Sequence, residues 1–396
     1  MSDDSRFTIR VPKKLVFGLI TVALILGLAE AGQRLYERHK QRDRGRPDDT
    51  FSDRHETTGG VPLSDKPGAM VNVLHPHRIF ALKPDQRLPG LTINAQGFRG
   101  RDWTKEKPPG VARVIVLGSS TAFGLGVRGD DRIFTALLER RLDEAPPDGR
   151  RVEVLNAAVG AYNSTQELIL LTTELLDYSP DAVLVFDGFN DFYIAAGTPP
   201  EAPLVHAHFD ETQEVIRRGR QTGLNILRLS AIFRRVENTL RDLGPRSEFG
   251  RIHPAGLALY GRNLEKICRV AKAYGAAVVL VSQPELFQRA EPVPEADRAV
   301  RAKRDRRGYG ELARREYPRF VAEAARVARA EGALHVDGTE AFDGHPEAVF
   351  TDWCHLTERG HELVADQLLP VVARALGAAR GGRAVPAGPS TPDARE

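Results

Sequence analysis

The sequence has few cysteines and almost no excess of charge. Cys268 and Cys354 are the only two cysteines among 396 residues, so at most one disulfide can form, and neither lies at the spacing of a metal-binding motif. Lys and Arg number 56 against 53 Asp and Glu, which gives a formal net charge of +3. A nearly balanced chain lacks the broad basic field that attracts nucleic acid. We therefore expect no nucleic-acid partner.

No apolar run reaches the length of about 20 residues that a membrane-spanning helix needs. The closest is the uncharged run 15–29, which follows a short basic segment, 1–14. Its length also suits the core of a signal peptide, and Ala29-Glu30-Ala31 resembles a cleavage site. A helical pattern nevertheless continues through this point. It favours an uncleaved anchor at 15–32 over a cleaved signal peptide or a buried helix of a folded domain.

The charges around this run give opposing indications of its orientation. We expect 1–14 to be cytoplasmic and the rest of the chain to lie across the membrane. The positive-inside rule argues against this topology, because more cations follow the run than precede it. Acidic residues such as Glu37 and Asp43 lie among those cations, and on this ground we keep the orientation, although acidic residues count little in that rule.

Changes in composition divide the rest of the chain into segments. A stretch rich in Asp, Arg, Gly and Pro is typical of a linker, and short β patterns follow it. Among these patterns His75 and His77 alternate, but no third ligand accompanies them, so we expect surface histidines and no metal site. The segments are a linker at 33–70, a β-rich extension at 71–111, a main domain at 112–378 with an insertion at 199–250, and a disordered tail at 379–396.

Strand and helix patterns alternate through the main domain. The strand candidates are short and mostly apolar, as buried parallel strands are. The alternation predicts an α/β fold with a five-stranded parallel sheet, covered by helices on both faces in three α/β/α layers. Ser164-Thr-Gln-Glu167 predicts a capping box, and the insertion is long enough to be a lid or a binding element. Strands are expected at 113–117, 152–156, 182–186, 276–281 and 333–336, and helices at 130–142, 165–178, 257–274, 311–331 and from 358.

The first of these strands runs directly into a turn that can present a nucleophile. Residues 113–117 are followed without a polar spacer by Gly118-Ser119-Ser120-Thr121. Open α/β sheets bind their ligands at the carboxyl ends of the strands. We therefore expect Ser120 to face that edge as a nucleophile, with Gly118 relaxing the backbone. The alternative is an ordinary turn that ends in a helix N-cap.

A second candidate group lies between the last strand and the last helix. Asp352-Trp-Cys-His355 places a carboxylate three residues before a histidine that stands just ahead of a helix. This spacing allows Asp352 to hold the His355 ring in one tautomer. The alternative is an Asp that caps the helix beside an incidental His. His361, one turn into the helix, is expected at the surface.

Two further strands end in small residues and carboxamides. The second strand is followed by 156–163, which begins and ends with Asn, and the third by Gly188-Phe-Asn190-Asp191. The carboxyl ends of parallel strands share one edge of the sheet. A nucleophile, a base, an orienting carboxylate and amide donors are therefore expected at one place.

Taken in chain order, the four segments resemble the four sequence blocks of the SGNH/GDSL hydrolases. The resemblance covers 112–378. Gly118-Ser119-Ser120 corresponds to the Gly-Asp-Ser block, and Gly188-Phe-Asn190-Asp191 to the Gly-x-Asn-Asp block. The resemblance implies a flavodoxin-like fold and a triad of Ser120 as nucleophile, His355 as general base and Asp352 as its orienting group. It implies neither a cofactor nor a metal.

The resemblance also implies an oxyanion hole. Its donors would be the backbone N–H of Ser120, a backbone N–H of the second block at Gly160 or Ala161, and the Asn190 side chain, with Gly188 and Asp191 in support. The chain departs from the family at two positions. Ser119 replaces the usual Asp, at a position that does not attack, and Ala161 replaces a Gly, so that it supplies its N–H only if its φ permits.

Together these features predict a serine esterase acting on ester-linked acyl groups. The anchor and the turn motifs are also similar to those of membrane-tethered bacterial members of the family. We therefore expect a single-pass protein of the bacterial inner membrane with a periplasmic or extracytoplasmic catalytic domain, secreted if 15–32 is cleaved, that removes O-acetyl groups from envelope polysaccharide. The alternatives are a lipase, lysophospholipase or thioesterase acting on long acyl chains, an acyltransferase using the same residues, and a non-catalytic carbohydrate-binding or assembly protein.

Overall fold

The computed structural model describes residues 21, 24–25, 27–36, 70–204, 251–305 and 308–381. The chain divides into two compact units, one formed by 1–49 and 213–246 and the other by 50–212 and 247–396. In the first unit, residues 27–36 are helical. Among the described residues, no helix combines the length and the apolar character needed to cross a membrane. The predicted segment 1–14 lies outside the described residues, as do parts of the predicted anchor and most of the linker, insertion and tail.

The second unit is built on a five-stranded parallel sheet with the strand order β6-β5-β7-β8-β9. In chain order this is 2-1-3-4-5, the order of flavodoxin-like folds, and the direction of winding changes between β5 and β7. The sheet therefore has a switch point at the carboxyl ends of these two strands, where the connections that follow them run in opposite directions along the sheet. The strands are β5 (Val111–Gly118), β6 (Arg151–Asn156), β7 (Ala182–Asp187), β8 (Ala277–Ser282) and β9 (Leu334–Asp337).

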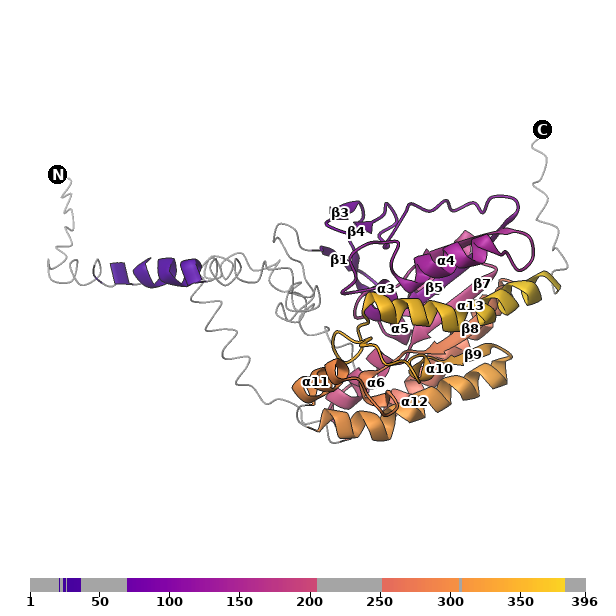
Figure 1. Cartoon of the computed structure of the whole chain (residues 1–396). Helices are drawn as coiled ribbons and strands as arrows, with labels where there is room; N and C mark the ends of the chain where they lie inside the picture. The colour runs from indigo at the N-terminus through magenta and orange to yellow at the C-terminus, as the bar shows by residue number, and fades with distance from the viewer. Residues whose placement is uncertain are drawn as a thin grey trace, which may run out of the picture. The chain divides into compact units, whose positions relative to one another are not determined.

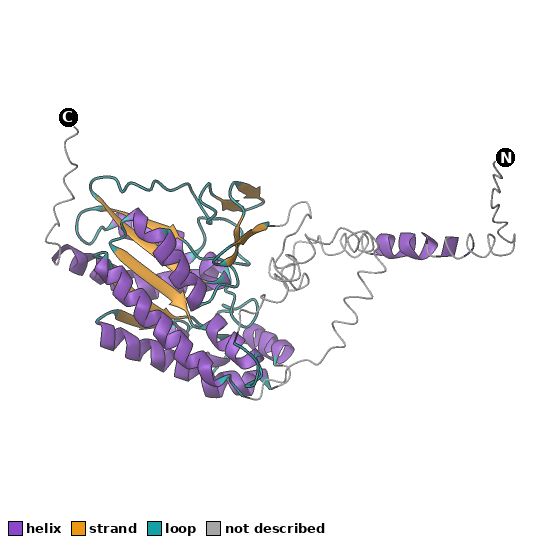
Figure 2. Cartoon of the chain, turned by 180° about the vertical axis from the view of Figure 1, so that it is seen from behind, coloured by secondary structure: helices purple, strands orange, loops and turns teal. Residues whose placement is uncertain are grey.

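Helices cover both faces of this sheet, so the predicted three-layer arrangement is confirmed (Figures 1 and 2). On one face α4 packs beside α13, and on the other α10 packs between α5 and α12. Shorter helices follow the ends of several strands. The long helices are α4 (Phe134–Glu144), α5 (Ser164–Thr173), α10 (Pro254–Ala273), α12 (Tyr309–Glu331) and α13 (Glu358–Gly381). The shorter ones are α3 (Ser120–Phe123), η1 (Leu175–Tyr178), α6 (Phe189–Gly197), η2 (Leu286–Gln288), α11 (Glu295–Arg304) and η3 (Gly338–Glu340).

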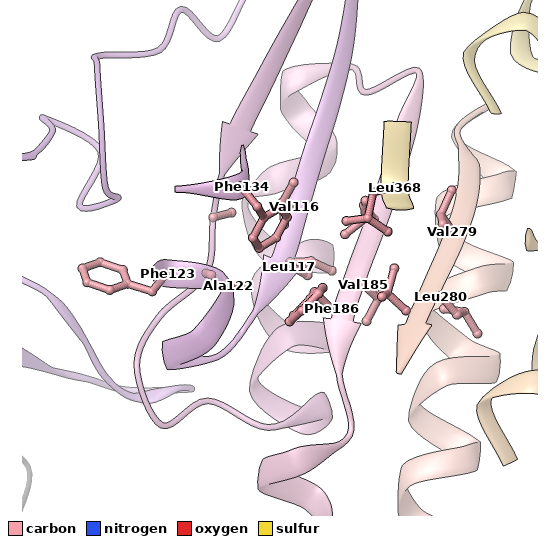
Figure 3. Close-up of a cluster of buried hydrophobic side chains, with 14 of the residues drawn as sticks. Val116, Leu117, Ala122, Phe123, Phe134, Val185, Phe186, Val279, Leu280 and Leu368 are labelled. Carbon is pink, nitrogen blue, oxygen red and sulfur yellow. The ribbon is translucent and has the colours of Figure 1, made fainter. Parts of the chain in front are cut away.

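The core lies between the sheet and its helices (Figure 3). All eight residues of β5 are buried, as its mostly apolar sequence predicts, and the burial includes Arg113. The ring of Phe134, from α4, lies 5.0 Å from that of Phe186 in β7, and Leu368 of α13 is buried beside the same sheet. Full burial of such side chains stabilises the fold by about 1.5–3 kcal/mol each.

The predicted strands agree with the structure to within two residues, but several helix boundaries differ. The helix expected at 130–142 begins at Phe134, and the one expected at 257–274 begins at Pro254. The expected helix 165–178 is interrupted, since α5 ends at Thr173 and η1 follows it. The predicted capping box is one residue too late. Asn163 is the cap, because its side chain accepts from the N–H groups of Thr165 and Gln166 while the Gln166 side chain bonds back to Asn163. The Ser164 hydroxyl is used elsewhere, and Glu167 is buried.

The extension before the sheet consists of two antiparallel hairpins. β1 (Asn72–His75) pairs with β2 (Ile79–Leu82), and β3 (Gln86–Leu88) pairs with β4 (Leu91–Ile93). The segment that follows β4 supplies Arg99, a buried side chain that donates hydrogen bonds to the carbonyls of Phe123, Gly124, Val127 and Gly129. The extension is thereby fastened to the turn that follows α3.

Candidate active site

Ser120 stands at the carboxyl end of β5, as the first residue of the short helix α3. Strand residues 111–118 and Ser119 are buried, whereas Ser120 is partly exposed. A side chain at Gly118 could not be accommodated, because its Cβ would lie 2.5 Å from that of Ala122 and 2.7 Å from the carbonyl oxygen of Phe186. Glycine at 118 therefore allows the strand to turn sharply and present the next-but-one residue at the sheet edge.

His355 and Asp352 meet Ser120 at this edge. The His355 Nε2 lies 2.8 Å from the Ser120 Oγ, and the His355 Nδ1 lies 2.6 Å from the Asp352 Oδ2. The other carboxylate oxygen of Asp352 accepts from the backbone N–H groups of Cys354 and His355, at 3.0 and 2.8 Å. The structure thus brings together the three residues that the sequence singles out for the triad, in the order alcohol, imidazole, carboxylate.

The electrostatics of this series fix its protonation. Burial alone raises the pKa of the Asp352 carboxyl, but the facing His355 ring and the hydrogen bonds it receives outweigh burial and lower that pKa to about 2. An ionised Asp352 accepts the proton of Nδ1. Nε2 of a neutral ring is then an acceptor for the Ser120 hydroxyl.

Asp352, Cys354 and His355 also form the one group of described residues whose potential metal-ligand atoms all lie within 4.8 Å of one another. Both carboxylate oxygens of Asp352 already accept hydrogen bonds from the loop and the ring. The group is arranged to orient the imidazole.

The second block lies beside Ser120. A Cβ built at Gly160 would be 3.9 Å from the Ser120 Cβ, so this glycine faces the candidate nucleophile. Ala161 has φ +66°, a conformation that is rare for a residue with a side chain and costs about 1–2 kcal/mol. Alanine therefore adopts here the backbone geometry that the family's glycine would take.

Asn190 joins the third block to the second. Its Nδ2 donates to the carbonyl oxygen of Tyr162 at 2.6 Å. Within the described residues, its side chain makes no hydrogen bond to Ser120 or His355. A carboxamide nitrogen carries two hydrogens, so one anchors the side chain and the other is available to a ligand.

Gly188 and Asp191 occupy supporting positions. Gly188 has φ +115°, and a Cβ there would lie 3.1 Å from the hydroxyl of Tyr260. Asp191 accepts from the backbone N–H of Ser164 at 2.9 Å and from its hydroxyl at 2.6 Å. The third block is therefore also tied to the start of α5.

Two acidic residues that sequence reasoning missed surround Asp191. Glu167 and Asp187 are buried, and no donor among the described residues reaches their carboxylate oxygens. Burial, reinforced by the neighbouring carboxylates, raises the pKa of Asp187 well above its usual range, and burial does the same for Glu167. A polar residue at the end of the buried strand β7 was the available signal for Asp187.

The expectation that His361 lies at the surface is wrong. His361 is fully buried in α13, its Nδ1 accepts from the N–H of Phe134 at 3.2 Å, and its ring stacks on that of Phe134. The ring lies on the face of α13 that packs against α4. Val364 and Leu368, three and seven residues later, share this face and are the signal that could have placed it.

Comparison with known proteins adds a family match. Residues 116–363 match the GDSL-like Lipase/Acylhydrolase family. No curated protein matches the chain. Among solved structures, TesA is similar at 18% identity, over 66% of this chain and 97% of its own, with a TM-score of 0.40. The acetyl xylan esterase AlAXEase is similar at 14% identity, over 66% and 99%, with a TM-score of 0.41. Axe2, an acetylxylan esterase from Geobacillus stearothermophilus, is similar at 16% identity, over 67% and 94%, with a TM-score of 0.39.

Proposed function

Because the chain belongs to the GDSL-like lipase/acylhydrolase family and is therefore an ester hydrolase, we propose that it cleaves ester-linked acyl groups with Ser120 as nucleophile, His355 as general base and Asp352 as orienting carboxylate. The observation that carries this proposal is the unbroken series of hydrogen bonds from the Ser120 Oγ through the His355 ring to Asp352, at 2.8 and 2.6 Å. Both distances lie within the range in which a base can accept a proton.

In the proposed reaction, His355 Nε2 takes the Ser120 proton as Oγ attacks the ester carbonyl. Asp352 remains ionised and stabilises the imidazolium. The imidazolium then protonates the leaving alcohol, which leaves an acyl group on Ser120. A water molecule, deprotonated by the same ring, releases the acid. An acceptor alcohol in place of water would make the same residues an acyltransferase.

The tetrahedral oxyanion needs donors that are already in place. We assign these to the backbone N–H of Ser120, the backbone N–H of the second block at Gly160 or Ala161, and the free N–H of the Asn190 amide. The approach of Gly160 to Ser120 and the anchoring of Asn190 on Tyr162 support this assignment.

We further propose that residues 15–32 anchor the domain to a bacterial inner membrane, with the catalytic domain outside the cytoplasm. The uncharged run 15–29 and the helical residues 27–36 that continue it support the anchor. Digestion of the domain by protease added to spheroplasts is expected. Protection from that protease would overturn the topology.

On this placement, an acylated polysaccharide of the envelope is the proposed substrate and acetate the proposed acyl group. Hydrolysis of p-nitrophenyl acetate and p-nitrophenyl decanoate by the purified protein separates this from the long-chain alternative. We expect acetate to be preferred. A strong preference for decanoate would identify a lipase or thioesterase instead.

Labelling by a fluorophosphonate tests the nucleophile directly. Wild-type protein should be labelled, Ser120→Ala should not, and Ser119→Ala should still be labelled because only the neighbouring hydroxyl is lost. Absence of labelling in folded wild-type protein would favour a non-catalytic binding protein.

A further inference from the structure

A buried chain of three hydrogen bonds runs behind Ser120. The Ser119 hydroxyl donates to the Gln283 Oε1 at 3.3 Å, the Gln283 Nε2 donates to the Thr121 Oγ1 at 2.9 Å, and the Thr121 hydroxyl donates to the carbonyl oxygen of Cys354 at 3.0 Å. Ser119 and Gln283 are 0% exposed, Thr121 is 1% exposed and Cys354 is 2% exposed. All four residues are therefore shielded from bulk water.

These three hydrogen bonds connect the turn that carries Ser120 to the loop that carries His355. Ser119 and Thr121 flank Ser120, and Cys354 directly precedes His355. The link passes through Gln283, which follows the end of β8. Gln283 is itself held in place, because its backbone N–H donates to the carbonyl of Asp187 and its own carbonyl accepts from the hydroxyl of Tyr317.

The three hydrogen bonds also share one direction of donation. Every group in this chain of bonds donates toward Cys354, and this orientation requires a donor at position 119. Such aligned bonds polarise and strengthen one another. An ionised acidic side chain at 119 could only accept, so Gln283 would have to reverse its amide. The Thr121 hydroxyl would then face the Gln283 oxygen and would be drawn away from Cys354.

We propose that Thr121 and Gln283 are positioning residues that hold the His355 loop at proton-transfer distance from Ser120, and that Ser119 sets the direction of the bonds that do so. This inference rests on the proposed function. Without the Thr121 hydroxyl, the Cys354 carbonyl loses this donor and the buried Gln283 Nε2 loses its acceptor, which weakens the connection that holds the loop. A displacement of about 1 Å in a catalytic group can cost about 100-fold in rate. The carboxylate of Asp352 and the bridge between Phe350 and Leu356 still hold the loop, so the fold survives.

Two matched pairs of variants test the proposal in the full-length protein. Thr121→Val removes the hydroxyl at nearly constant volume, and Thr121→Ser keeps it. For p-nitrophenyl acetate we expect Thr121→Val to lower kcat about 10- to 100-fold with KM little changed, and Thr121→Ser to remain near wild type. Equal kcat in Thr121→Val and wild type, or equal loss in both variants, would overturn the proposal.

The second pair is independent of any folding defect in the first. Ser119→Asp and Ser119→Asn have nearly the same shape, but only Asn can donate to the Gln283 Oε1. We expect kcat of Ser119→Asp to be at least 10-fold below that of Ser119→Asn, even though Asp restores the family's usual residue. Equal kcat values for the two Ser119 variants would refute the proposed direction of the hydrogen bonds. Should wild type neither hydrolyse the ester nor take the fluorophosphonate label, the proposed function itself would fail; a labelled wild type with unaffected variants would refute only the positioning role.

Discussion

Asp191 holds Ser164 by two hydrogen bonds, one from its backbone N–H at 2.9 Å and one from its hydroxyl at 2.6 Å. Asp191 belongs to the first turn of α6, which carries Asn190, and Ser164 begins α5 just after the second block. The two segments proposed to form the oxyanion hole are therefore clamped together behind the site. Burial raises the pKa of Asp191 as well as that of Asp187, but only Asp191 accepts the two Ser164 donors.

Asp191→Asn and Asp187→Asn should consequently behave differently. An amide at 191 has one acceptor oxygen for two Ser164 donors, so we expect a lower melting temperature and about a 10-fold loss of kcat. The Asp187 carboxyl accepts neither Ser164 bond, and burial raises its pKa, which favours the uncharged form that an amide resembles, so we expect activity near wild type. Steady-state kinetics and thermal melting of both variants measure the difference. Similar losses in the two variants would contradict a specific clamp.

Asn190→Ala removes the side-chain donor assigned to the oxyanion hole. Loss of one such donor typically lowers kcat by about 10²- to 10³-fold, and we expect that loss here with little change in KM. The Ser120–His355 pair is untouched, so the variant should still accept the fluorophosphonate label, at a reduced rate. Hydrolysis at the wild-type rate would show that Asn190 only braces Tyr162.

His361 makes the free energy of unfolding depend on pH in the acidic range. Burial, followed by the charges of Arg99 and His355, lowers the pKa of His361 to about 3 from an ordinary value of 6.5. Between pH 3 and pH 6.5, His361 binds a proton in the unfolded chain but not in the folded one. The folded state with a neutral His361 therefore keeps its full free energy of unfolding above pH 6.5. This free energy falls by at most about 1.4 kcal/mol per pH unit as the pH drops from 6.5 toward 3.

Urea unfolding at several pH values between 7 and 4 measures this effect. The free energy of unfolding of His361→Gln should fall less steeply with acid than that of wild type, because no imidazole remains to be protonated on unfolding. His77→Gln, at an exposed position, is the matched control and should keep the wild-type slope. Identical slopes in all three proteins would rule out His361 as the acid-sensitive group.

The parts of the fold that sequence reasoning predicts are those fixed by local pattern. The strands are short, mostly apolar runs, and Ser120, His355 and Asp352 each follow the end of a strand or precede a helix. Gln283 also follows a strand, but its importance depends on reaching both Ser119 and Thr121, which are 164 and 162 residues away. Such a junction exists only once β5 and β8 have been placed in one sheet. The Asn163 cap was missed because Ser164, the stronger local candidate, is taken by Asp191.

Arg99 provides a test of how the N-terminal extension supports the nucleophile. Its guanidinium pairs with Asp130 at 2.8 Å and donates to four carbonyls in the turn that follows α3. Lysine carries the same charge but lacks the planar fork of donors, so Arg99→Lys removes buried donors from these carbonyls, of which those of Gly124 and Gly129 still accept from the N–H groups of Val127 and Arg132. We expect a loss of about 3 kcal/mol in the free energy of unfolding and a lower kcat, because the turn that fixes α3 loosens. Arg101→Lys, on the same segment but 49% exposed in its side chain, is the control and should change neither quantity appreciably. An Arg99→Lys protein as stable and as active as the control would show that α3 holds Ser120 without help from the extension.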